Sequence, residues 1–568
     1  MKFQKNTPKS VWEEYASGVR FKNGLGSRGL YEQNRINERF YVGDQWQGAR
    51  CGNDRPLVRH NLIKRIGDYK MAMIGKSQVT VSFSADGVPE TLAMREAIIP
   101  LKAELAKGGA KSEFGKLTAM PLPAERELGL VMAALSDYYR VTAERVRFAD
   151  IQEQALRNAY ISGTGIVYTW WDDRVSTGLY ADDGRTTPIQ GDISCEVLDV
   201  ENVYFGDPNL DSIQDQPYIL IAQRRGVEDI KREARKNKRP EYEVQSILPD
   251  GETDYMAGER SRNEPPESQK ATVLTKFWKD YSPDGTGYVI KAVRVCRKAV
   301  IRPEWELGIR LYPFAKMTWE RRRGCVYGES EITYLIPNQI AINRMITASV
   351  WAVMMMGMPI MVVNSDIVTT DVTNDPGQII PVCGGMDDVA AAIRYVNPPG
   401  FSPAFDQNIA SLIGNTLKQS GANDVVLGDV RPDNTSAILA VRETATIPLI
   451  YIQNRFYSFL EDVARIWAEF WVTHYGKRRV KIRDELGTWY LPFDGERYRE
   501  LVISARVDVG ASTLWNDEQT ITTLDGLFDR KIIDAAQYLS RLPKGSVPEL
   551  NRLLNEIRRR KAENSDSE

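Results

Sequence analysis

Two glycine–lysine pairs, in IGKS (Ile74 to Ser77) and FGKL (Phe114 to Leu117), have residue types that can hold a phosphate. A Walker A loop also needs a glycine five residues before the pair, so that the backbone can wrap around the phosphate, and Lys70 stands at that place before Gly75. FGKL fails the same test, and its Leu117 offers no hydroxyl to a magnesium ion. IGKS follows an apolar helical pattern, which is typical of a helix C-terminus.

The acidic residues lack the spacing of a metal site. Asp250, followed by Glu267 and Lys270, resembles the acids and lysine of a metal nuclease but has one residue too many between acid and lysine. Residues 182–187 lack the spaced acids and the distal glutamate of a calcium loop. The sequence therefore predicts no metal ligand and no cofactor.

Histidine and cysteine offer little for nucleophilic or zinc chemistry. The chain has two histidines, His60 and His474, and neither stands in HExxH or beside a cysteine cluster. The five cysteines are scattered without a CxxC pair, which suits a reducing cytosol better than a disulfide framework. GxSxG is also missing, so we expect no catalytic residue and a protein that is not an enzyme.

The bulk composition is that of a globular protein of a few domains. The 568 residues are 42% apolar and 26% charged, and 74 Lys and Arg nearly balance 76 Asp and Glu. No overall field would attract nucleic acid or an anionic membrane, so a DNA contact would need a local patch. The N-terminus has no apolar core of its own, and we expect no secretory signal.

One stretch, Arg344 to Asp366, has no charge between its two ends, which is the length that a membrane-spanning helix needs. Gly357 and Pro359 interrupt it, and the pattern before them is amphipathic. We expect a long helix over about 329–356, a break, and a short buried strand at 360–363. An element buried in a large soluble assembly explains the missing charges without lipid.

Periodicity predicts helices and strands along the rest of the chain. A β-hairpin is expected at 271–281 and 287–302, around the turn SPDGTG. Gly163 to Gly165 should end a helix and start a strand. Further helices are expected at about 27–42, 61–74, 124–139, 143–161, 403–420 and 435–471, the last with a kink at Pro448.

Six stretches follow one another in a recognisable order. They are RFYVGDQW with RPLVRHNLIKRIGDYKMAMI, LRNAYISGTGIVYTWWDD, VENVYFGDP with DQPYILIAQRRGVEDIKREA, WERRRGCVYGESEITYLIPNQIAINRMITASV, LKQSGANDVVLGD with NTSAILAVRETATIPL, and LDGLFDRKIIDAAQYLSRLPKGSVPEL. Together they resemble the portal proteins of tailed double-stranded DNA bacteriophages, which form the ring at one capsid vertex. Each stretch is weakly specific, but the order covers nearly the whole chain. Residues 86–123 and 240–270 match no part of the pattern.

The resemblance implies a mostly helical α+β portal fold with wing, stem helices, clip, tunnel loop and helical crown. It also implies that the clip lies between the two stem helices. The expected parts are 1–225 N-terminal wing, 226–240 first stem helix, 241–327 clip, 328–357 second stem helix, 358–510 C-terminal wing with tunnel loop and tunnel helix, and 511–568 crown with a disordered tail.

The resemblance further implies a function: a conduit for genome packaging and ejection, built as a homo-oligomeric ring, a dodecamer in the family. Its partners would be double-stranded DNA, the terminase large subunit, a head-completion or tail adaptor, and the major capsid and scaffolding proteins, with no membrane. The location would be the portal vertex of the virion, and the host cytoplasm during assembly.

Two sets of residues are candidates for contact with DNA. The first, facing the channel, is Asn397, Pro398, Pro399, Lys418 and Gln419; an exposed polar face and an ordinary turn explain these residues equally well. The second is a basic cluster that could contact DNA or an acidic partner, or form a solvated helix face. Its residues are Lys231, Arg232, Arg235, Lys236, Lys238 and Arg239.

The apolar helix supplies candidates for contacts between subunits. In a ring, stem helices of neighbouring subunits pack side by side, so a helix apolar nearly all round is expected; periodicity alone also allows the core helix of a monomer. The candidates are Ile340, Asn343, Met345, Val350, Trp351 and Met354. Two other classes of function remain as alternatives: a nucleic-acid-processing enzyme and a membrane-associated channel.

Overall fold

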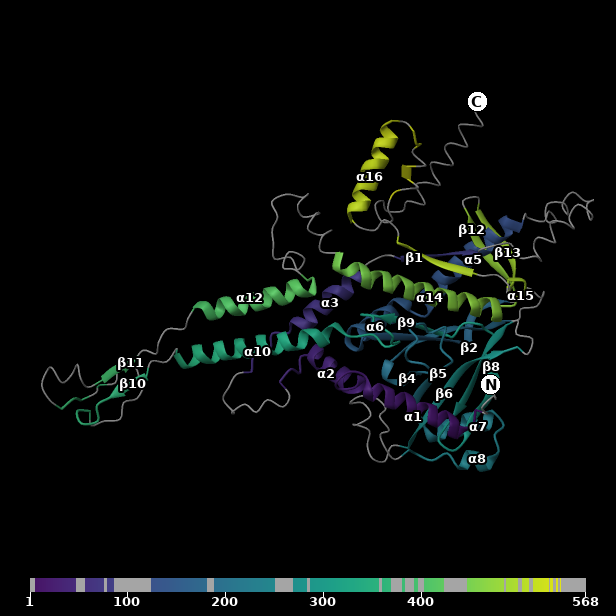
Figure 1. The fold of residues 1–568 in the computed structure, drawn as a ribbon. Helices are drawn as coiled ribbons and strands as arrows, with labels where there is room; N and C mark the ends of the chain where they lie inside the picture. Colours follow the sequence, from purple (N-terminus) through teal and green to yellow (C-terminus); the bar gives the residue numbers. More distant parts are fainter. Residues whose placement is uncertain are drawn as a thin grey trace, which may run out of the picture.

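The computed structural model is a mixed α/β structure, about 52% helix and 24% strand. Most of the described chain forms one body, from which a long arm of two helices projects (Figure 1). The structure describes residues 6–46, 57–75, 79–85, 124–180, 188–250, 269–282, 287–356, 360–368, 379, 381–383, 393–396, 403–422, 447–484, 487–498, 503–509, 514–530, 532–534, 538–539 and 542.

Several helices lie where periodicity places them. The α-helices are α1 Pro8–Gly24, α2 Leu30–Val42, α3 Leu62–Gly75, α5 Ala124–Arg145, α6 Phe148–Ser162, α7 Val227–Lys236, α8 Glu241–Gln245, α10 Glu331–Met356, α12 Pro403–Ser420, α14 Ile450–His474, α15 Gly495–Tyr498 and α16 Leu514–Asp529. The described ranges also contain the short 3-10 helices η2 Val200–Asn202 and η3 Ile447–Leu449. Helix α1 was not expected, although Thr7 caps it and Pro8 begins it, a common start signal.

In the described part of the chain, the strands form two larger sheets and three two-stranded ones, and the pairs between them are antiparallel. The sheet orders are β3-β2-β9, β4-β5-β6-β7-β8, β1-β14, β10-β11 and β12-β13. The strands are β1 Val79–Ala85, β2 Thr164–Tyr180, β3 Pro188–Leu198, β4 Val203–Phe205, β5 Tyr218–Gly226, β6 Lys270–Tyr281, β7 Tyr288–Val295, β8 Val300–Glu306, β9 Phe314–Thr318, β10 Ile360–Val363, β11 Ile393–Val396, β12 Lys477–Asp484, β13 Gly487–Asp494 and β14 Ile503–Val509.

The five-stranded sheet joins two segments that were expected to belong to different parts, the wing and the clip. Strand β5, from the expected wing, pairs with β6, from the expected clip, along its whole length from Tyr218 opposite Trp278 to Gly226 opposite Lys270. The expected boundaries at 225 and 240 therefore divide a continuous sheet. The hairpin β6–β7 lies where its turn residues predicted it.

The short basic helix α7 lies on this sheet rather than standing apart as a stem. Its apolar residues Val227, Ile230 and Ala234 are buried and belong to one cluster with Val273 and Ile301 of the sheet. Because the helix has ten residues and one face is covered, segment 226–240 does not have the form expected of a stem helix. The packing of this apolar stripe holds the helix on the sheet.

Helix α14 carries much of the core. Trp467 and Trp471 are fully buried, and the ring of Trp467 lies 5.1 Å from that of Tyr139 and 5.0 Å from that of Phe148. Such aromatic contacts join α14 to α5 and α6. The helix begins after Pro448, since the residues before it form a 3-10 turn at Ile447–Leu449.

The turn between α6 and β2 holds the body close to the start of α10. Gly163 ends α6 with φ +81°, and a Cβ there would lie 2.6 Å from the backbone of Gly328. A Cβ on Gly165 would lie 2.1 Å from the carbonyl oxygen of Ala155. The glycine turn predicted from GTG is confirmed, and it allows three backbone segments to meet.

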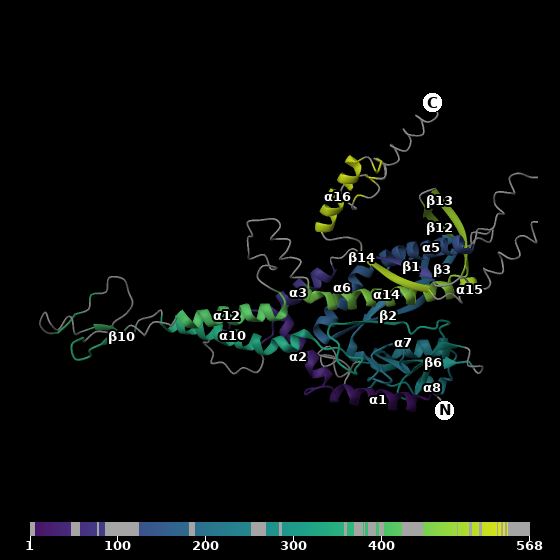
Figure 2. The same cartoon turned by 45° about the horizontal axis from the view of Figure 1, so that its top comes forward.

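The arm consists of α10 and α12, which run in opposite directions, with β10 and β11 paired at its outer end (Figures 1 and 2). Asn338 of α10 donates to Thr416 Oγ1 of α12 over 3.3 Å, which fixes the register of the two helices near the body. The expected long helix at 329–356 and strand at 360–363 are confirmed, whereas the expected break at 357–359 lies outside the described residues.

Candidate functional site in the projecting arm

The root of α10 is held by side-chain amides that pair with an extended backbone segment. Gln339 accepts from the Leu62 N–H over 3.0 Å and donates to the His60 carbonyl over 2.7 Å. Asn343 accepts from the His60 N–H over 3.0 Å and donates to Gln45 over 2.6 Å. These amides satisfy backbone groups that have no sheet partner, so they fix where the arm leaves the body.

A buried ion pair lies at the first turn of α10. Lys70 Nζ of α3 donates to Glu331 Oε1 over 2.6 Å, and the two side chains are 6% and 9% exposed. The second carboxylate oxygen of Glu331 accepts from Trp319 Nε1 over 3.1 Å. A carboxylate at a helix N-terminus also complements the helix dipole. Sequence reasoning missed this pair, since 261 residues separate its members.

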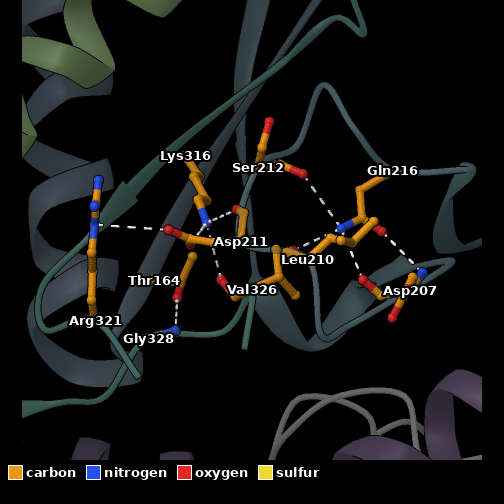
Figure 3. A network of polar contacts seen from close by, with 10 residues as sticks. All are labelled: Thr164, Asp207, Leu210, Asp211, Ser212, Gln216, Lys316, Arg321, Val326 and Gly328. Carbon is orange, nitrogen blue, oxygen red and sulfur yellow. Dashed lines mark hydrogen bonds and ion pairs between the residues drawn. The ribbon is translucent and has the colours of Figure 1, made fainter. Parts of the chain in front are cut away.

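The loop before β5 braces the neighbouring part of the body (Figure 3). The Gln216 amide donates to the carbonyls of Asp207 and Leu210, each over 2.9 Å, and accepts from the Asp207 N–H over 3.0 Å. One side chain therefore closes the whole turn. The turn at Asp207-Pro208 is held in large part by this amide.

Lys316 of β9 ties that turn to the segment leading into α10 (Figure 3). Its ammonium donates to Asp211 Oδ1 over 2.6 Å and to the Val326 carbonyl over 3.4 Å. Burial lowers the pKa of Lys316, and the Asp211 carboxylate partly opposes this. Thr164 accepts from the Gly328 N–H over 2.8 Å, so both ends of the 326–328 segment are fixed.

Helix α10 exposes apolar side chains near both of its ends. Tyr334 is 53% exposed, Val353 59% and Met354 54%. Pro337, Arg344 and Ala348 are also exposed, and with Tyr334 they recur at spacings of three, seven and four, which places them on one face. Exposed apolar side chains on a projecting helix are a feature of surfaces that meet another protein.

The predicted inter-subunit residues do not share one environment. Asn343 is 2% exposed, and its side chain is hydrogen-bonded to Gln45, Gln339 and His60. Its contacts therefore lie within one chain. Met354 is exposed. The remaining four are partly exposed: Ile340, Met345, Val350 and Trp351.

The outer face of α12 is polar and nearly uncharged. Asn408, Ser411 and Asn415 are exposed and recur at helical spacing, and Lys418 and Gln419 continue this face toward the body. The two channel candidates on this helix are thus exposed side chains. The other three, at 397–399, lie outside the described residues.

Acids of the same chain largely neutralise the basic cluster at 231–239. The ion pairs are Lys231–Glu228 at 3.3 Å, Arg232–Asp229 at 3.4 Å, Arg235–Glu241 at 3.1 Å and Arg239–Glu243 at 2.5 Å. Lys236 and Lys238 have no ion-pair partner among the residues that the structure describes. This pattern favours a solvated helix face over an anion-binding patch.

Glu233, on the inner side of the same helix, fixes it to the sheet. Its carboxylate lies 2.6 Å from both Arg294 and Arg225. Burial alone would raise the pKa of Glu233, but the two guanidinium groups outweigh it and hold the pKa below its usual value. The arginines of this region therefore serve its packing.

Within the described ranges, no helix is long and apolar enough to cross a membrane. The same residues contain no group of three or more His, Cys, Asp or Glu side chains placed to hold a metal ion. Comparison with protein-family models and with curated proteins finds no match for this chain.

Proposed function

We propose that this chain is the subunit of a portal ring, the conduit through which a tailed bacteriophage packages and ejects its double-stranded DNA. The observation that carries the proposal is the projecting arm, whose helix α10 exposes Val353 and Met354 over half of their surface. Leaving such side chains in water costs free energy that packing against neighbouring subunits would recover. The six ordered sequence stretches support the same reading.

The arm is a better candidate for a stem helix and the clip than segments 226–240 and 241–327, which the sequence suggested for these roles. The family pattern has two stem helices with a clip between them. Along the chain, the paired strands β10 and β11 likewise lie between α10 and α12. The described residues of 226–327 instead pack into the body through the five-stranded sheet. We therefore assign α10 and α12 to the stem, the segment between them to the clip, and the sheets to the wing.

The surface of α12 suits a channel in which DNA must slide. Each phosphate that a protein neutralises adds affinity and salt dependence, so a channel wall dense in cations would hold the duplex. Helix α12 offers Asn408, Asn415 and Gln419 with Lys418 as its one cation. Amide side chains can contact phosphates without adding charge, and such contacts carry no sequence information.

In this role the ring has no enzymatic step of its own. A terminase would dock on it and hydrolyse ATP during packaging, and a tail adaptor would replace the terminase afterwards. The proposed setting is the portal vertex of a virion, reached after assembly in the host cytoplasm.

The native mass of the purified protein in detergent-free buffer tests the proposal. Light scattering should give a mass of about a dozen subunits, and no ATP- or metal-dependent turnover of DNA should accompany it. A monomer at high protein concentration would contradict the ring. Metal-dependent cleavage of DNA by the pure protein would favour the enzyme instead.

A further inference from the structure

The two helices of the arm carry four charged side chains, of which one is buried and three are exposed. Helix α10 has Glu331, buried against Lys70, and Arg344, which is exposed. Helix α12 has Asp406 near its outer end and Lys418 near the body, both exposed. Arg344 and Asp406 have no ion-pair partner within the described ranges. One open cation on α10 therefore accompanies one open anion on the outer half of α12.

The register of the arm places these two charges at similar distances from the body. Asn338 lies beside Thr416, and the helices are antiparallel, so position 344 lies level with about position 410. Asp406 is four residues further out, which corresponds to about 6 Å along the helix. An arginine side chain spans such an offset. A neighbouring arm set at the same height would bring the two groups within reach.

We propose that a second copy of this chain docks on the arm head to tail, with α10 of one subunit against α12 of the next and Arg344 paired with the partner's Asp406. The inference rests on the proposed ring and names the contact that sets its direction. Exposed Ala348 lies one turn beyond Arg344 on the same face of α10 and leaves room for a close helix approach.

The charges also select this contact over a symmetric one. If α10 met α10 about a twofold axis at this level, Arg344 would face Arg344, and like charges placed together disfavour a complex. A head-to-tail contact pairs opposite charges and repeats around an axis. Such heterologous contacts close into rings when the rotation fits.

Asp406 also has a role within its own helix. It lies in the first turn of α12, where a carboxylate complements the helix dipole. Replacing it could weaken the helix without touching an interface. The test therefore needs a readout that a merely structural role would not change.

Two charge-reversed chains, Arg344→Glu and Asp406→Arg, provide that readout when they are mixed. Alone, each places like charges at every contact, and the protein concentration for half-assembly should rise at least about 10-fold. Mixed one to one, each α10 meets an α12 of opposite charge, and rings of alternating chains should return. Within each chain the two charges remain alike, so rescue by mixing requires a contact between subunits.

Arg140→Glu, an exposed reversal on α5 far from the arm, is the matched control and should assemble as the native chain does. Native mass is measured for each sample, and circular dichroism checks that the helices persist. Rings that persist in both single variants, or no rescue on mixing, would overturn the pairing and leave the ring proposal standing. A native chain that forms no ring would overturn the proposed function itself.

Discussion

At the scale of single residues, the arm depends on buried polar groups that no local pattern reveals. In the sequence, Lys70 stands where a Walker A loop would need a glycine. In the structure it pairs with Glu331, which is 261 positions away. Gln339 and Asn343 stand one helical turn apart in the sequence, and that spacing was visible. Their partners, the backbone of His60 and Leu62, follow from tertiary packing alone.

The first prediction concerns the buried pair at the arm root. Lys70→Met should lower the free energy of unfolding by about 3–5 kcal/mol, because Glu331 would be left charged and unpaired in the interior. The double variant Lys70→Met/Glu331→Gln should recover most of this loss, since glutamine keeps an acceptor for Trp319. Urea unfolding measures both; equal stability of Lys70→Met and the native chain would refute the role of the pair.

The second prediction concerns pH. His474 stacks on Trp171 with ring centroids 4.7 Å apart, and burial lowers its pKa from 6.5. A depressed pKa gives stability that is full above about pH 6.5 and lost as the pH falls through the folded value. The urea midpoint should therefore drop between pH 7.5 and pH 5.5. His474→Phe keeps the stacking but cannot be protonated, and it should show a smaller drop; an identical drop would exclude His474 as the source.

At the scale of elements, periodicity predicted α10, β10 and α12 within a few residues, because each is a regular repeat of apolar positions. In the segment 226–240 most residues are charged or polar, and the apolar residues among them include Val227, Ile230 and Ala234. These three residues form a narrow apolar stripe, and such a stripe indicates a helix that packs on a surface.

The third prediction concerns the attachment of α10. Asn343→Ala removes the acceptor of the His60 N–H and the donor to Gln45, a cost of about 1–3 kcal/mol that falls on the arm root. Amide hydrogen exchange should quicken in the first turns of α10 while the core helix α14 stays protected. Asn415→Ala, at an exposed position of α12, serves as the control; unchanged exchange in α10 would mean that Asn343 does not anchor it.

At the scale of the whole molecule, the mixed α/β class was predictable and the sheet order was not. The order β4-β5-β6-β7-β8 depends on which strands pair, although β5 and β6 are more than 40 residues apart in the sequence. The residues of one strand do not show which other strand it will pair with. The domain boundaries expected at 225 and 240 fall within the span of this sheet. How the chain assembles is harder still to predict from the sequence, because assembly depends on surfaces that a single folded chain leaves exposed.

A single-particle image reconstruction of the detergent-free protein tests the central claim most directly. We predict a closed ring of about a dozen subunits whose arms lie side by side around a hole wide enough for a DNA duplex. A monomer, an open filament, or a ring whose arms point away from its axis would contradict the account.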